Sequence, residues 1–157
     1  MSRLIVSGMS AVGVLCVATW AAPAWADDHG LRAPPLPAYK NECSACHVAY
    51  PASLLPPASW QRLMTTLPKH FGTDASLDAA TTQQISDWLT TRSGGRRVTE
   101  PPPEDRITKG RWFIRKHDEV PAAVWKRADV KKASNCAACH TRAEEGSFRE
   151  REIRLPQ

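Results

Sequence analysis

The chain has 157 residues, and its 21 lysines and arginines exceed its 16 aspartates and glutamates, giving a formal net charge of +5. This length fits one domain or two small ones. The positive charge is too mild to imply strong non-specific binding of nucleic acid or of an anionic membrane, so nucleic acid is not an expected partner.

The N-terminus has the pattern of a secretory signal peptide over residues 1–26. Arg3 precedes a mostly apolar run, and the small-residue pattern Ala24-Trp25-Ala26 predicts cleavage before Asp27. The alternative is a retained membrane anchor, but the run is short, contains serine and glycine, and is not followed by a cluster of positive residues. We therefore expect an exported, periplasmic protein with no stable membrane insertion after cleavage.

Residues 27–95 are predicted to form a first, helical domain. The Pro-rich lead over 32–38 suits an extended surface segment. A helix is predicted to begin at Pro57 because apolar residues follow at helical spacing, namely Trp60, Leu63, Met64 and Leu67. A second helix over 78–92 has Ile85, Trp88 and Leu89 on one face and ends before Ser93-Gly94-Gly95.

The stretch 96–105 contains three prolines and several charges and is predicted to be a linker. Residues 106–157 then form a second small domain, with a helix over 106–117, a shorter helix over 121–125 and a charged tail over 144–154 that reads as solvated surface. No strand-type alternation is present, so the fold class is all-α. The second domain has few large apolar residues, and a bound cofactor would supply its missing core.

Two copies of the motif C-x-x-C-H contain all four cysteines of the processed chain: Cys43, Cys46 and His47, then Cys136, Cys139 and His140. In this motif both thiols can add to the vinyl groups of one haem, and the adjacent histidine becomes an axial ligand of the iron. A zinc site is disfavoured because 89 residues separate Cys46 from Cys136. A thioredoxin-like pair would need a βαβ context, which the sequence lacks.

Each iron needs a sixth ligand, and the processed chain offers few candidates besides His47 and His140. They are His29, His70, His117 and Met64. His29 lies beside the cleavage site, where order is not expected. The spacing of Met64 from Trp60 and Leu67 favours a core position. We expect His70 to serve the first haem and His117 the second, although a surface role for either histidine stays open.

The chain resembles the dihaem cytochrome c family whose members donate electrons to a small oxygen-binding monohaem cytochrome. The resemblance rests on four stretches, at residues 42–60, 70–78, 106–117 and 135–148. It implies two small helical cytochrome c domains, each built round one covalently bound haem c. It also implies attachment at Cys43, Cys46, Cys136 and Cys139, and axial ligation by His47, His70, His117 and His140.

The expected function is therefore transfer of single electrons between a redox donor and a haem-protein acceptor, rather than catalysis. Two alternatives remain. One is a small dihaem oxidoreductase with one open iron, such as a peroxidase or a sulfur-compound dehydrogenase. The other is a haem subunit of a larger redox complex, which would be expected to expose a sizeable apolar docking patch.

Overall fold

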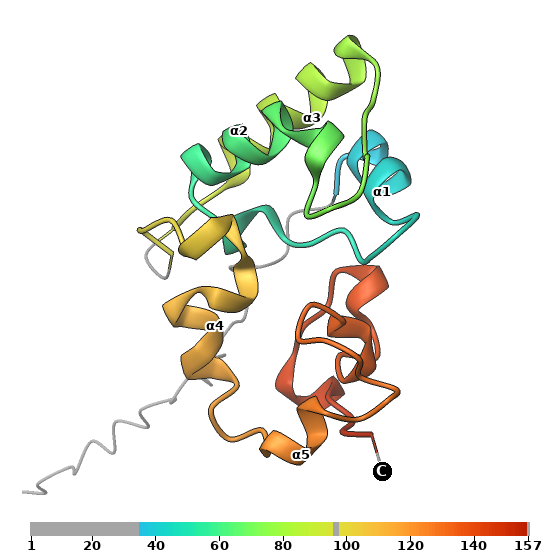
Figure 1. Ribbon diagram of the computed structural model, residues 1–157, viewed down its shortest axis with the longest axis vertical. Coiled ribbons are helices and arrows are strands. Elements are labelled where there is room, and N and C mark those ends of the chain that lie inside the picture. The colour runs from blue at the N-terminus through green and yellow to red at the C-terminus, as the bar shows by residue number, and fades with distance from the viewer. Residues whose placement is uncertain (1–34, 96–97, 157) are drawn as a thin grey trace, which may run out of the picture.

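The computed structural model describes residues 35–95 and 98–156 (Figure 1). The predicted signal peptide and His29 lie outside these residues. Within them the chain forms helices and two isolated bridges but no strand, which confirms the all-α prediction. The α-helices are α1 (Pro37–Cys43), α2 (Pro57–Thr65), α3 (Ala79–Arg92), α4 (Arg111–Lys116) and α5 (Ala122–Trp125). Single 3₁₀ turns lie between them, namely η2 (Ala52–Leu54), η3 (Leu67–Lys69), η4 (Pro103–Asp105) and η5 (Ile107–Lys109), and three more follow α5: η6 (Cys136–Ala138), η7 (Ala143–Glu145) and η8 (Glu150–Glu152).

The first half packs α1, α2 and α3 around one apolar core. Ile85 and Leu89 lie one turn apart on α3 and are fully buried. The other members of the cluster come from α1, α2 and the segment between them: Tyr39, Ala52, Leu55, Trp60 and Met64. The Trp60 indole Nε1 donates to the Ala52 carbonyl at 2.7 Å, which satisfies its buried polar group.

Two helices match their predicted bounds closely. The helix α3 begins after Asp78, whose carboxylate accepts from the Thr81 amide as an N-cap, and it ends before Ser93. The short helix α5 follows Pro121, as expected. The helix predicted from Pro57 stops earlier, at Thr65, because Pro68 has no amide N–H with which to continue the α-helical hydrogen bonds, and the chain tightens into η3.

The prediction for the Pro-rich lead was wrong over its described part. The helix α1 begins inside it, at Pro37, and Leu36 and Ala38 pack against the core. Proline suits the first turn of a helix, because its fixed φ is already helical and its missing N–H would have no partner there. Burial of Tyr39, which is 3% exposed, then draws this segment inward.

The helix predicted over 106–117 is interrupted at Gly110. There the backbone is extended, with ψ of 141°, and separates η5 from α4. A Cβ atom at this position would lie 3.1 Å from the Ile107 carbonyl oxygen, so the close approach of the backbone favours glycine. The prediction missed this break because the apolar spacing continues across it.

The C-terminal tail does not form a plain solvated surface, as its alternating charges had suggested. It folds back on the second C-x-x-C-H motif, where the Arg154 amide donates to the Cys139 carbonyl at 2.9 Å. Ser147 is 2% exposed, and the Thr141 hydroxyl donates to the Glu152 carbonyl. The charges pair with one another, as in the contacts of Arg142 with Glu145 and Glu152.

Two groups of contacts join the first half to the rest of the chain, which lies below it in Figure 1. The Arg62 guanidinium donates to both oxygens of Asp105, and Ile107 packs against the first-half core. Further along, the Tyr50 hydroxyl donates to the Ser134 carbonyl at 2.8 Å. No helix within the described ranges is both long and apolar enough to cross a membrane.

Candidate haem centres

In each C-x-x-C-H motif a backbone hydrogen bond joins the histidine to the first cysteine. The first begins where α1 ends, and the His47 amide donates to the Cys43 carbonyl at 3.5 Å. The second begins with η6, and the His140 amide donates to the Cys136 carbonyl at 2.8 Å. In both motifs one turn therefore separates the first cysteine from the histidine, which is the arrangement that haem attachment requires.

None of the four motif cysteines forms a disulfide. Burial, followed by the neighbouring Glu42 carboxylate, raises the pKa of the Cys43 thiol to about 11, and burial raises that of Cys136 to about 11 as well. Burial also raises the pKa of Cys139. Thioredoxin-like redox pairs need a lowered thiol pKa, so these values argue against that alternative.

The first pair of histidines brings together His47 and His70. Their ring centroids are 6.2 Å apart and their planes differ by 30°. His70 begins a tight turn in which Phe71 and Gly72 have φ of 49° and 96°, and the Thr73 amide donates to the His70 carbonyl at 3.0 Å. Positive φ at two successive residues favours glycine, and a bulky residue such as Phe71 is unusual there.

The second pair brings together His117 and His140. Their centroids are 6.1 Å apart and their planes differ by 71°. His117 caps the C-terminus of α4 and stacks on Phe113, one turn earlier, at 4.0 Å between ring centroids. His140 lies 5.2 Å from the Phe148 ring, which the tail supplies. The structure thus places all four predicted ligand histidines in two facing pairs.

The spacing of each pair fits a metal ion between the rings. With metal–nitrogen bonds of about 2 Å on each side and each ring centre roughly 1 Å further out, a metal between two imidazoles separates their centroids by about 6 Å. Both observed separations match this value. The described residues do not suit a metal ion bound by protein side chains alone, because they contain no group of three histidine, cysteine or carboxylate side chains placed to hold one.

The hydrogen bonds of the rings leave nitrogen lone pairs available for a metal. Nδ1 of His47 donates to the Val48 carbonyl at 2.8 Å, and Nδ1 of His117 donates to the Phe113 carbonyl at 2.9 Å. Because a carbonyl oxygen only accepts, Nδ1 carries the proton in both rings and Nε2 keeps its lone pair.

The other histidine of each pair has no such anchor. Nδ1 of His70 and Nδ1 of His140 are buried without a hydrogen-bond partner in the described part of the chain. Burial, followed by the facing His47, lowers the pKa of His70, and burial with the facing His117 lowers that of His140. Both rings are therefore held in the neutral form that binds metals.

Sequence reasoning missed two aromatic residues of these centres. Tyr50 stacks on His47 with centroids 4.6 Å apart and planes only 12° apart, and Phe148 borders His140. Burial and the nearby Cys136 raise the pKa of Tyr50 to about 12, which reflects its place beside the second motif. Tyr50 also hydrogen-bonds to Ser134, which lies 84 positions further along the chain. No spacing rule links two residues so far apart, so only the fold reveals this contact.

Comparison with known proteins agrees with this arrangement. The family model described as dihaem cytochrome c matches residues 39–148. The chain is 37% identical to a diheme cytochrome type c from Shewanella baltica OS155, with a TM-score of 0.67, covering 76% of this chain and 92% of that one. It is 48% identical to diheme cytochrome c from Rhodobacter sphaeroides in two solved structures, with TM-scores of 0.65 and 0.62, covering 72% of this chain and 96% of each.

No curated protein matches the chain. The family match spans more than half of the chain, and it includes both C-x-x-C-H motifs and both facing pairs of histidines. The chain therefore belongs to the dihaem cytochrome c family, whose members transfer electrons through two covalently bound haem c groups.

Proposed function

We propose that this protein is a periplasmic electron carrier in which each of two irons is held by two histidines. The first haem is attached through Cys43 and Cys46, and the second through Cys136 and Cys139. The axial ligands are His47 with His70, and His117 with His140. The observation that carries this proposal is that the four histidines lie in two facing pairs, whose ring centroids are 6.2 and 6.1 Å apart.

The position of Met64 supports histidine over methionine as the sixth ligand of the first haem. Met64 is 7% exposed and belongs to the apolar cluster of the first half. Replacing an axial methionine with imidazole lowers the reduction potential, so both couples are expected at low potential. Two filled axial positions also leave no site for oxygen or peroxide, which suits electron transfer rather than catalysis.

The expected partners are redox proteins. The resemblance to the family suggests a small oxygen-binding monohaem cytochrome as acceptor, but this part of the proposal rests on analogy. Export by the predicted signal peptide would bring the protein to the periplasm, where covalent attachment prevents loss of the cofactor.

A dihaem oxidoreductase with one open iron is the second candidate, and one observation favours it. His70 lacks a hydrogen bond at Nδ1 and precedes Phe71, whose φ of 49° is unusual for a bulky residue. If either iron opens, it is expected to be the one bound by His70.

The proposal is tested by low-temperature EPR of the oxidised, haem-loaded protein and by optical spectra after reduction under CO. We expect two low-spin ferric signals and no CO adduct in the wild type. His70→Ala should convert one signal to high spin and produce CO binding at about one haem per chain. His29→Ala, beside the predicted cleavage site, is the matched control and should leave both signals unchanged. A His70→Ala protein that stays low-spin and does not bind CO would contradict the assignment.

A further inference from the structure

Tyr50 touches both candidate haem centres at once. Its ring stacks on His47, the motif histidine of the first centre, with centroids 4.6 Å apart and planes 12° apart. Its hydroxyl donates to the Ser134 carbonyl at 2.8 Å, two residues before Cys136 in the second centre. One side chain therefore joins the axial ligand of one centre to the backbone that leads into the other.

We propose that Tyr50 is a positioning residue with two roles: its ring fixes the plane of the His47 imidazole, and its hydroxyl fixes the separation of the two haem centres. This inference rests on the proposed function, in which His47 is an axial ligand. It adds a residue that neither binds the cofactor covalently nor ligates the metal.

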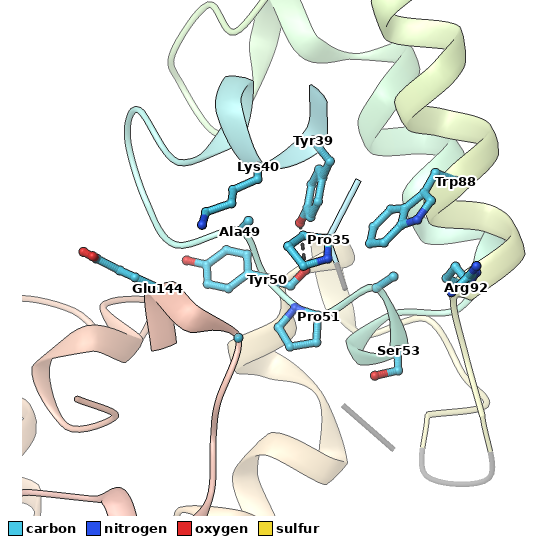
Figure 2. A pocket seen from close by; sticks show the side chains of 12 residues that line it. Pro35, Tyr39, Lys40, Ala49, Tyr50, Pro51, Ser53, Trp88, Arg92 and Glu144 are labelled. Carbon is cyan, nitrogen blue, oxygen red and sulfur yellow. Dashed lines mark hydrogen bonds between the residues drawn. The ribbon is translucent and has the colours of Figure 1, made fainter. Parts of the chain in front are cut away.

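The stack is held from both sides. Tyr39, which is 3% exposed in the first-half core, donates its hydroxyl to the Tyr50 carbonyl at 2.8 Å and so ties the Tyr50 backbone to that core (Figure 2). The His47 ring is fixed in turn by the bond from its Nδ1 to the Val48 carbonyl. Rotation of the His47 imidazole about its Cβ–Cγ bond would break both this hydrogen bond and the stacking contact with Tyr50.

The space around Tyr50 does not fit a substrate. The pocket beside it has a volume of about 50 Å³ and is lined from the first half by Tyr39, Tyr50 and Trp88 and from the second by Glu144 and Gly146. Figure 2 shows the Tyr50 ring between Pro51 and Glu144. Pockets that hold organic ligands are several times larger. The pocket is therefore a small gap in the junction between the halves, and the bond to Ser134 acts as a directed link across that junction.

The separation of the centres matters for the family's activity. Exchange between them moves one electron from a ferrous iron to a ferric iron, with no bond formed or broken and no proton transferred. Its rate depends on how far apart and how steadily the two centres are held. Loss of the hydroxyl should loosen the junction, whereas loss of the ring should also release the His47 imidazole.

These two roles can be separated with Tyr50→Phe and Tyr50→Leu in the oxidised, haem-loaded protein. Pulsed EPR would measure the iron-to-iron distance distribution, and continuous-wave EPR the g values of each low-spin signal. Tyr50→Phe should broaden the distance distribution and leave both sets of g values unchanged. Because Tyr50→Phe removes one neutral hydrogen bond, it should lower the ratio of docked to separated halves roughly fivefold. Tyr50→Leu should broaden the distribution and also shift the g values of one signal.

Ser93→Ala is the matched control, because it removes a part-buried hydroxyl hydrogen bond inside the first half, to the Thr90 carbonyl at 2.8 Å, and leaves the contacts of Tyr50 with Tyr39, His47 and Ser134 in place. Its distance distribution and g values should match the wild type. Two low-spin signals in the wild type, together with unchanged distributions and g values in both Tyr50 variants, would overturn the inference but leave the proposed ligation standing. A wild type without two low-spin signals would overturn the proposed ligation, and this inference with it.

Discussion

The four histidines proposed as axial ligands differ in what holds their Nδ1 atoms. Hydrogen bonds to backbone carbonyls anchor His47 and His117, whereas the described residues give His70 and His140 no such bond. An anchored imidazole keeps its tautomer and orientation and is a more basic ligand. The unanchored His140 is still restrained because it follows Cys139, an attachment residue. His70 has no neighbouring attachment point, so we expect it to be the most easily displaced of the four proposed ligands.

This difference predicts the order in which an added ligand binds. Cyanide should displace His70 before any other histidine, with an affinity for the first haem about fivefold higher than for the second, as expected for one missing neutral hydrogen bond. The titration is followed by EPR of the oxidised protein, and the cyanide-bound form of His70→Ala provides the reference signal for the first haem. Binding at the second haem first would show that the Nδ1 bonds do not control ligand exchange.

At this scale the sequence predicted which histidines lie opposite each other and the core position of Met64, because motifs and helical spacing are local signals. Their role as axial ligands remains a prediction. It could not predict the stack of Tyr50 on His47, nor the Nδ1 bonds. These contacts depend on side-chain orientations that only the folded chain fixes.

At the scale of elements, the boundaries with strong local chemistry were predicted best. The helix α3 has a capping aspartate at one end and a Ser-Gly-Gly stop at the other, and both bounds match. The helix α1 was missed because its Pro-rich start resembles an extended linker. The break at Gly110 was missed because its cause is the approach of the Ile107 carbonyl, which no periodicity reveals.

The contact between α2 and η4 predicts a pH dependence of stability. The Arg62 guanidinium, which donates to both Asp105 oxygens, lowers the pKa of this carboxyl below its ordinary value of 3.8. A lowered pKa in the folded state stabilises the protein above the ordinary pKa, and this stabilisation is lost as the pH falls through the lowered value. Asp105→Asn should therefore lower the thermal midpoint slightly at pH 7, and the difference should shrink as the pH falls below 3.8.

The measurement is the thermal midpoint of haem-loaded wild type and variant between pH 7 and pH 2, by circular dichroism. Glu150→Gln is the matched control, because Glu150 meets Lys116 at 3.4 Å and its side chain is 82% exposed. That variant should follow the wild type at every pH. A difference for Asp105→Asn that does not shrink between pH 7 and pH 2 would show that the side chain acts through packing rather than charge.

At the scale of the whole molecule, the two halves depend on haem to different degrees. The first half has a core of seven buried residues, with Ile85 and Leu89 fully covered. In the described part of the second half, the buried side chains are Phe113, Val130, Ala143 and Ser147, and they form no comparable cluster. The sequence predicted this small core, because residues 104–157 contain few large apolar side chains. The placement of the domain boundary at 96–105 remains a prediction.

A chain segment that buries so little apolar surface does not offset its loss of conformational entropy without another source of stability. Covalently bound haem would be that source in the second half, where Phe113 stacks on His117, one of the proposed ligands. We therefore expect Cys136→Ser combined with Cys139→Ser to unfold residues 111–156 and to leave α2 and α3 folded around the first haem. Amide hydrogen exchange should then show protection reduced to that of an unfolded chain across the second half.

The reciprocal variant, Cys43→Ser combined with Cys46→Ser, is the matched control for this asymmetry. It removes the same chemistry from the half that has its own core, so amides of α3 near Ile85 and Leu89 should keep part of their protection. Equal loss of protection in both halves of both variants would mean that the protein folds as one unit in which either haem is indispensable. Protection that persists in the second half without its haem would mean that its few buried side chains and tail contacts suffice, against the entropy argument.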